Sequence, residues 1–394
     1  MTTTTPIRVT PNADQIARTK AAIDHYITSI DQNPDRRDGA YPYYLFHEPG
    51  QPIFGTVMLF HGFSARPHQM WRLADYLFRS GFNVYQASLA GHSFLPADRY
   101  WPQIDLKPEY AEPLKRKVKQ DPVLMGMLTQ MMGGDPTQIK HPNPLQQAAL
   151  AARLLRIEPE LFQIKKALED YDNPNFDRYF TSSHENYLTE ARSRLTELDA
   201  MPGAIYTVGL SVGGAVALAL AADHPNRIQR VVAYAPLLEI HGKDNELYVN
   251  IAGPLDLQEA GWDPSLRFPV GCFTANNRFG DFVLRPESMR TLRRIPTCLI
   301  LTENEDAADL STNEKFTQNL GGEAQGHYSY LYSAGDLVPH PMVDPTEVSQ
   351  SMSNRYWQTM YQETYRFLVQ GRIDPDNLAR LHQDGQLPLV PDLT

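Results

Sequence analysis

The chain has 394 residues, of which 42% are hydrophobic and 21% are charged, and its formal net charge is −10 at pH 7. This length and composition fit one large α/β domain that carries an insertion, or two domains. The negative charge argues against a nucleic-acid-binding protein, because the short basic cluster at 115–117 is better explained as a solvated helix face.

Cysteine usage and apolar runs indicate the compartment. The two cysteines, Cys272 and Cys298, form no Cys-x-x-Cys pattern, which argues against a disulfide scaffold and a structural zinc site. The sequence contains neither a signal-peptide core nor a run of 18 apolar residues. We therefore expect a cytoplasmic protein without a transmembrane segment, a metal ion or another cofactor. The sequence leaves a homodimer open.

The first part of the chain alternates between predicted strands and helices. The predicted elements are a helix over 12–31, strands at 41–47 and 53–60, a helix over 67–80 and a strand at 82–87. The helix over 67–80 begins at Pro67, where the missing backbone N–H costs nothing. Its apolar side chains recur at helical spacing, which predicts one face turned toward a core.

Residues 95–181 form a proline-rich segment without obvious strands, which predicts an insertion of short helices. Within it, Leu124, Met127, Leu128 and Met131 would share one face of a helix. Methionine adapts to irregular apolar ligands, so this face could form a lid over an acyl-binding cleft. The alternative is that the same face only packs the insertion onto the body of the protein.

The second part of the chain returns to alternating strands and helices. A Ser182-x-x-Glu185 capping box predicts the start of the first helix. The predicted elements are a helix over 183–199, a strand at 204–208, a helix from 212 to near Pro225, a strand at 230–236, a helix over 286–294, strands at 297–301 and 328–332, and a helix over 350–369. Residues 237–284 read as a second, irregular insertion.

This alternation predicts an α/β fold with a mostly parallel central sheet and helices on both faces. We expect the body to comprise residues 1–94, with a leader helix, and residues 182–394, with a C-terminal tail. Residues 95–181 are expected to form a helical lid or cap insertion, and 237–284 a smaller insertion.

The run Gly209-Leu210-Ser211-Val212-Gly213 has the form Gly-x-Ser-x-Gly. The same pentapeptide also occurs by chance in loops. Here it lies between a predicted buried strand and a predicted small-residue helix, which favours a tight turn that holds Ser211 in strained backbone geometry with its hydroxyl exposed. The two glycines remove side chains that would collide across such a turn.

Together with three further motifs, this run resembles the α/β-hydrolase superfamily. The motifs are His61-Gly62-Phe63 after a strand, Gly209 to Gly213, Asp306 after a strand, and His340 after the last strand. The resemblance covers about residues 41–94 and 182–369 and is closest to the branch of monoacylglycerol lipases, lysophospholipases and serine aminopeptidases. Two features depart from that branch: Gly91-His92-Ser93 breaks its Gly-His-Gly-x-Ser motif, and the longer insertion comes earlier in the chain.

A serine hydroxyl needs a base within hydrogen-bond reach, and histidine is suited to that role. The fold implied by the resemblance orders the catalytic residues as serine, acid and histidine. Of the later histidines, His382 lies in the tail and His327 precedes its strand, whereas His340 follows that strand at the carboxyl edge. We therefore expect Ser211 as the nucleophile and His340 as the base.

The remaining site residues are implied by the resemblance. The family acid follows its strand at a distance that selects Asp306, with Glu303, Glu305 and Asp309 as rivals. The oxyanion hole needs backbone N–H donors, which are expected at Phe63 and Val212. His61 and His92 are expected to make structural hydrogen bonds. Met127, Met131 and Trp262 are the candidate pocket residues.

These residues predict a serine hydrolase that cleaves a carboxylic ester with an apolar acyl or alcohol group, through an acyl-enzyme intermediate. The expected partner is a small-molecule or lipid ester substrate. Two alternatives stay open: amide or peptide hydrolysis or acyl transfer by the same triad, and a non-catalytic binding member of the fold. Serine at position 211 argues against a dehalogenase, which needs a carboxylate as its nucleophile.

Overall fold

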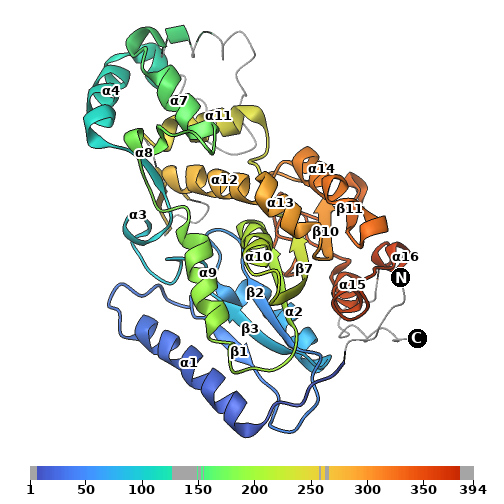
Figure 1. The fold of residues 1–394 in the computed structure, drawn as a ribbon. Helices are drawn as coiled ribbons and strands as arrows, with labels where there is room; N and C mark the ends of the chain where they lie inside the picture. Colours follow the sequence, from blue (N-terminus) through green and yellow to red (C-terminus); the bar gives the residue numbers. More distant parts are fainter. Residues whose placement is uncertain are drawn as a thin grey trace.

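The computed structural model describes residues 7–126, 149, 152–153, 155–256, 259–261 and 266–381. Its centre is a seven-stranded sheet of order β1-β3-β2-β6-β7-β10-β11 (Figure 1). The strands are β1 (Tyr43–Leu45), β2 (Thr56–Phe60), β3 (Asn83–Ala87), β6 (Ile205–Leu210), β7 (Ile228–Tyr234), β10 (Thr297–Thr302) and β11 (Tyr328–Tyr332). β1 pairs antiparallel with β3 and the other neighbours pair in parallel, so the predicted α/β class is confirmed.

The strands form where apolar runs can be buried on both faces of the sheet. Every residue of β2, β3, β6 and β10 is buried. Side chains alternate between two cores, as the two-residue period of a strand requires: Met58 and Phe60 point into one, and Val57 and Leu59 into the other.

Helices cover both faces. One face carries α1 (Ala13–Asp31), α9 (Asn186–Thr196), α10 (Val212–Asp223), α12 (Gly271–Leu284), α13 (Pro286–Leu292) and α14 (Leu310–Leu320). The other carries η1 (Pro67–Met70), α2 (Trp71–Arg79), α15 (Trp357–Gln370) and α16 (Pro375–Leu378). Among the described residues, no helix combines the length and the apolar character needed to cross a bilayer.

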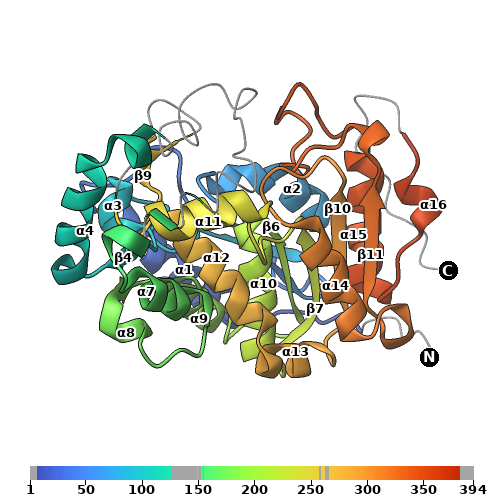
Figure 2. The same ribbon diagram turned by 90° about the horizontal axis from the view of Figure 1, so that it is seen from above.

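The two insertions pack together as one helical unit, which we call the cap. It contains β4 (Ile104–Leu106), α4 (Pro108–Gln120), α7 (Leu161–Glu169), α8 (Phe176–Tyr179), β5 (Phe180–Ser182) and α11 (Lys243–Ala252). These elements gather at one end of the molecule, opposite α15 and α16 (Figure 2). Their buried side chains form a separate core that includes Leu255 and Ala275 from the second insertion.

A buried arginine fastens the cap to the body. Arg278 of α12 donates hydrogen bonds to the carbonyl oxygens of Leu168 (2.6 Å) and Tyr171 (2.9 Å). Its guanidinium also lies 3.7 Å from the ring centroid of Phe176. Because these contacts engage both terminal nitrogens of a side chain that is only 3% exposed, they offset part of the cost of burying its charge.

Some predicted elements differ from the observed ones. Residues 95–181 were expected to lack strands, but β4 and β5 form an antiparallel pair there. The predicted capping box is wrong: α9 begins at Asn186 without a side-chain cap, because the Ser182 hydroxyl contacts Nδ1 of His184 instead (2.7 Å). The second insertion, expected to be irregular, contains the 14-residue helix α12.

The candidate pocket residues Met127, Met131 and Trp262 lie outside the described residues, as do Leu128 and His382. Leu124, from the same predicted helical face as Met127, is buried in the cap core. An apolar cavity lies near it, lined by Leu106, Leu114, Leu161, Phe162, Phe180 and Leu255. Whether the cap moves as a lid stays a prediction.

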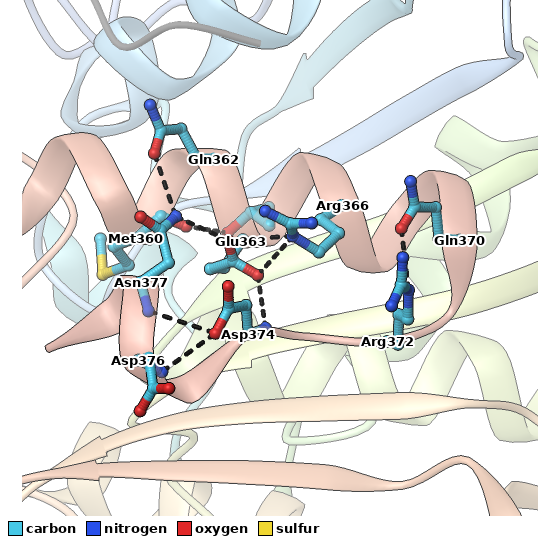
Figure 3. Close-up of polar contacts among 10 residues, drawn as sticks. Met360, Gln362, Glu363, Arg366, Gln370, Arg372, Asp374, Asp376 and Asn377 are labelled. Atoms are coloured by element: carbon cyan, nitrogen blue, oxygen red, sulfur yellow. Dashed lines mark hydrogen bonds and ion pairs between the residues drawn. The ribbon is translucent and has the colours of Figure 1, made fainter. Parts of the chain in front are cut away.

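A buried carboxylate joins α16 to α15 (Figure 3). Glu363 is fully buried and accepts hydrogen bonds from the backbone N–H of Asp374 (2.6 Å), from Nδ2 of Asn377 (2.7 Å) and from Nε of Arg366 (2.9 Å). Asp374 in turn caps α16 by accepting from the backbone N–H groups of Asp376 and Asn377. The carboxylate thus fixes the last helix against the sheet-covering helix α15.

We expect Glu363→Ala to lower the free energy of unfolding by about 3 kcal/mol, because it removes a buried acceptor shared by the Asn377 amide and two half-buried donors. Urea denaturation monitored by circular dichroism measures the change. The matched control is Gln370→Ala on the same helix, whose Oε1 accepts only from Arg372 among the drawn residues; it should cost less than about 1 kcal/mol. Equal losses in the two variants would contradict this role of Glu363.

Candidate active site

Ser211 sits on a sharp turn between β6 and α10. Its backbone has φ 57° and ψ −121°, a conformation that a non-glycine residue adopts only under constraint. The constraint comes from the neighbouring strand β7: the Ser211 N–H donates to the carbonyl of Tyr234 (2.9 Å), and its own carbonyl accepts from the N–H of Leu237 (3.0 Å). This is the nucleophile-elbow geometry that the sequence predicts.

The glycines of the elbow are required by close backbone approaches. A Cβ atom at Gly209 would lie 2.0 Å from the carbonyl oxygen of Gly213. A Cβ atom at Gly213 would lie 2.3 Å from the carbonyl oxygens of both Phe60 and His61, at the end of β2. The collisions expected from the Gly-x-Ser-x-Gly pattern are therefore confirmed.

The Ser211 hydroxyl lies at the carboxyl edge of the sheet. The side chain is 5% exposed, and no hydrogen bond of its hydroxyl occurs within the described part of the chain. β6, β7, β10 and β11 run parallel, so the loops that follow all four strands emerge at the same edge. His340 and the acidic loop 303–309 lie on two of these loops.

The loops after β10 and β11 are tied together by their backbones. Asn304 and Pro339 form a parallel bridge, and the Thr302 hydroxyl donates to the carbonyl of Val338 (2.5 Å). In this register the residues that come next, Glu305 and His340, lie side by side. Nδ1 of His340 is 2.6 Å from Oε1 of Glu305, and the two side chains are 12% and 4% exposed.

The sequence favoured Asp306 as the partner of His340, whereas the structure places the carboxylate of Glu305 against Nδ1. Asp306 is exposed, and its Oδ2 accepts a hydrogen bond from Nε2 of Gln350 (2.8 Å). The physical reason is the bridge register, which places residue 305 opposite residue 340. Glu305, one of the rivals in the sequence, is also held by the backbone N–H groups of Ala307 (3.0 Å) and Ala308 (2.9 Å).

The electrostatics of this pair favour a charged imidazole. Burial alone would lower the pKa of His340, but the carboxylate of Glu305 raises it, with smaller contributions from Asp306 and Glu347, and the pKa ends above its usual value. Burial would raise the pKa of Glu305, but His340 and two backbone N–H groups hold it below the usual value. The arrangement can therefore stabilise an imidazolium formed during a reaction.

Two backbone N–H groups are available for an oxyanion hole. Val212 is the first residue of α10, and Phe63 follows β2 in the loop 61–65. Among the described residues, no hydrogen bond uses the N–H of either one. Loop 61–65 is held by Gln69, which accepts from the Gly62 N–H (2.7 Å), and by Arg37, which donates to the carbonyls of Ser64 (2.8 Å) and Ala65 (3.1 Å).

Arg37 and Gln69 hold loop 61–65 in place, and the sequence analysis did not identify either residue. Arg37 falls between predicted elements, and Gln69 is a polar residue on a predicted helix, so no local pattern distinguishes either one. Their partners in loop 61–65 lie 7 to 28 residues away along the chain. Only the fold brings these two side chains to loop 61–65, which we call the oxyanion loop because it carries the predicted donor Phe63.

The other histidines have structural partners. Nδ1 of His61 contacts the carbonyl of Gly62 (2.9 Å), its Nε2 accepts from the N–H of Leu89 (3.1 Å), and burial lowers its pKa to about 4. His92 stacks on the ring of Trp101 at 4.0 Å. His327 is buried with Nε2 3.2 Å from the carbonyl of Arg293. These contacts agree with the structural roles expected for His61 and His92.

Three side chains could in principle hold a metal ion: ligand atoms of Glu305, Asp306 and His340 lie within 4.8 Å of one another. The ion pair between Glu305 and His340 already uses two of these groups. Nδ1 faces a carboxylate, and the opposite ring nitrogen stays available for proton transfer. The chemistry of the cluster therefore fits a histidine–carboxylate pair.

Comparison with known proteins gives one family match. Residues 166–336 match the model of a family described as putative esterase, which is less than half of the chain. A sequence search of curated proteins gives no match.

Solved structures are similar at low sequence identity. One is a metagenome-derived lipolytic enzyme described with LipS and LipT (14% identity, 84% of this chain and 98% of that chain covered, TM-score 0.48). Another is a soluble variant of monoglyceride lipase from Saccharomyces cerevisiae (15% identity, 87% and 98% covered, TM-score 0.45). A third is the monoacylglycerol lipase of Paleococcus ferrophilus (14% identity, 84% and 99% covered, TM-score 0.46).

The family match covers β6, the elbow, β7, β10, the acidic loop and β11, but neither His340 nor β2 and loop 61–65. The order of the sheet and the strained serine between β6 and α10 independently indicate an α/β-hydrolase fold. On this topology, this elbow and this match, the chain is a hydrolase with the α/β-hydrolase fold.

Proposed function

We propose that the chain is a serine esterase in which Ser211 is the nucleophile, His340 the base and Glu305 the acid. The observation that carries the proposal is the pairing of a strained, hydroxyl-bearing elbow with a histidine–carboxylate pair 2.6 Å apart at the same sheet edge. The chain order serine, acid, histidine is the order of the fold. The acid differs from the Asp306 that the sequence favoured.

The mechanism follows from these groups. His340 takes the proton of the Ser211 hydroxyl through Nε2 while the serine oxygen attacks the ester carbonyl carbon. The N–H groups of Phe63 and Val212 receive the oxyanion of the tetrahedral intermediate. His340 then returns the proton to the leaving alcohol, and the carbon–oxygen bond breaks to leave an acyl-serine. Water activated by the same histidine releases the acid and regenerates the serine.

The surroundings of the oxyanion loop support an apolar substrate group. The ring of Phe63 lies 5.0 Å from that of Phe268, 5.2 Å from Phe273 and 5.4 Å from Trp101 between centroids. Phe63 and Phe273 are half-buried, so part of this cluster faces outward next to the predicted oxyanion donor. An acyl or alcohol group that approaches Ser211 there would bury its methylenes against aromatic rings, each contributing about 0.8 kcal/mol.

Replacement of the nucleophile is the first test. Ser211→Ala should lower ester turnover by on the order of 10⁴-fold or more while leaving the fold intact, and it should abolish labelling by a fluorophosphonate probe. Ser193→Ala is a matched control on the exposed side of α9 and should retain both ester turnover and fluorophosphonate labelling. If the Ser211→Ala protein is labelled as strongly as the parent, the nucleophile is another residue. A wild-type protein that is not labelled at all would instead favour a binding member of the fold.

The pH profile identifies the acid. Activity requires neutral His340, so kcat/KM should fall as pH drops through its raised pKa. Glu305→Gln removes the charge that raises this pKa, so the acid limb of the kcat/KM profile should move to lower pH. The plateau value of kcat/KM should fall by on the order of 10³-fold. Asp306→Asn should shift the acid limb less and should lower the plateau value of kcat/KM by less than about tenfold. The reverse ranking of the two variants would restore Asp306 as the acid.

A panel of esters tests the substrate class. We expect kcat/KM to rise several-fold for each two carbons from acetyl toward medium-chain esters, and Phe273→Ala should flatten this trend more than it lowers acetyl-ester turnover. Phe162→Ala, in the cap cavity, is the control. Preference for acetyl esters or aminoacyl amides, with no effect of Phe273→Ala on the trend, would favour a small-ester hydrolase or a peptidase.

A further inference from the structure

A glutamine side chain connects the oxyanion loop to the loop that carries His340. Oε1 of Gln69, on η1, accepts a hydrogen bond from the Gly62 N–H at 2.7 Å. Nε2 of the same amide donates to both carboxylate oxygens of Glu347, at 3.0 and 2.9 Å. Glu347 lies 278 residues further along the chain, between His340 and α15.

The orientation of the Gln69 amide follows from its two partners. The Gly62 N–H can only donate, so it must face the amide oxygen. The carboxylate of Glu347 accepts, so it must face the amide nitrogen. The flipped amide would lose both contacts, which makes the assignment independent of how the oxygen and nitrogen atoms are distinguished.

The two peptide groups on either side of the Gly62 Cα atom are both held by hydrogen bonds. The Gly62 N–H is bound by Gln69, and the Gly62 carbonyl accepts from Nδ1 of His61 (2.9 Å) and from the N–H of Ala65 (3.2 Å). The Phe63 N–H lies in the same peptide plane as that carbonyl and points the opposite way. Fixing the Gly62 backbone therefore fixes the direction of the Phe63 N–H.

We propose that Gln69 and Glu347 are positioning residues that aim the Phe63 N–H into the oxyanion hole. This inference rests on the proposed function, because it assigns the pair a role in stabilising the oxyanion. Gln69 supplies the acceptor for the loop, and Glu347 holds Gln69 in the required orientation. The same contact joins the oxyanion loop to the loop that carries His340, so it holds the Phe63 N–H and His340 in a fixed relative position.

The chain offers a control for general loosening of these loops. Arg72 lies on α2, one turn after Gln69, and its Nε is 3.4 Å from Oδ1 of Asp344, three residues before Glu347. This pair joins the same two segments but makes no contact with Gly62. Arg72→Ala therefore loosens the segments without releasing the oxyanion loop, and it should leave kcat unchanged within about twofold, because a 3.4 Å ion pair with a half-exposed arginine contributes little.

The experiment compares Gln69→Ala, Glu347→Ala, the double variant and Arg72→Ala in the full chain. Gln69→Ala should lower kcat for esters by about 10- to 100-fold with KM changed less than about threefold, because misaiming one donor affects the transition state and not substrate binding. Glu347→Ala should lower kcat less, and Glu347→Gln should recover part of the loss because its amide oxygen still accepts from Gln69. The double variant should resemble Gln69→Ala alone, since the two residues act through one path.

A trifluoromethyl ketone provides a second measurement. It forms a tetrahedral adduct whose oxygen occupies the oxyanion hole, so its affinity should fall in proportion to kcat/KM in Gln69→Ala and stay unchanged in Arg72→Ala. A purely structural role would lower thermal stability without this proportional loss. Unchanged kcat in folded Gln69→Ala, or equal losses in Gln69→Ala and Arg72→Ala, would overturn the inference.

Fluorophosphonate labelling separates this inference from the proposed esterase function. Phosphonylation of Ser211 uses the nucleophile and the oxyanion hole but requires no ester substrate. If wild-type protein is labelled and hydrolyses no ester, the esterase proposal fails, and a labelling rate at least tenfold lower in Gln69→Ala still supports the inference. An equal labelling rate in wild-type protein and Gln69→Ala overturns the inference whatever the substrate, and absence of labelling in wild-type protein overturns both proposals.

Discussion

The site depends on the absence of a side chain at Gly213. The first turn of α10 packs directly against the end of β2, where a Cβ atom would come within 2.3 Å of two carbonyl oxygens. This contact brings Ser211, on the turn after β6, and the Val212 N–H, at the start of α10, next to the loop that carries Phe63. In the proposed site, two donors from distant parts of the chain could face one oxygen atom because their backbones approach so closely.

The second half of the site depends on the backbone bridge between Asn304 and Pro339. It places His340 against Glu305, and the resulting cluster of carboxylates around the imidazole outweighs the effect of burial on its pKa. Glutamate suits this position because its second methylene lets the carboxylate reach Nδ1 while accepting two backbone N–H groups of its own loop. The histidine orientation is thereby set by main-chain pairing as much as by the ion pair.

The sequence could predict the features that are encoded by residues adjacent in the chain. The elbow is readable because glycines, strand and helix are adjacent in the chain, and the sheet is readable because its strands are buried on both faces. Asp306 was chosen by counting along one loop, whereas the choice between 305 and 306 depends on pairing with a second loop. Gln69 and Glu347 carry no local pattern, since they meet across 278 residues. The pocket residues Met127, Met131 and Trp262 remain predictions.

The separate core of the cap has a consequence for how such a protein can be altered. Its apolar side chains pack mainly on one another, and the buried Arg278 provides a fixed attachment on α12. The elbow and both catalytic loops are built by the sheet and the helices that cover it. Chimaeric proteins that exchange only the outer helices α4, α7 and α8, with 237–284 retained, would therefore vary the cap while keeping Trp101, Phe268 and Ile240, which contact the loops of the site.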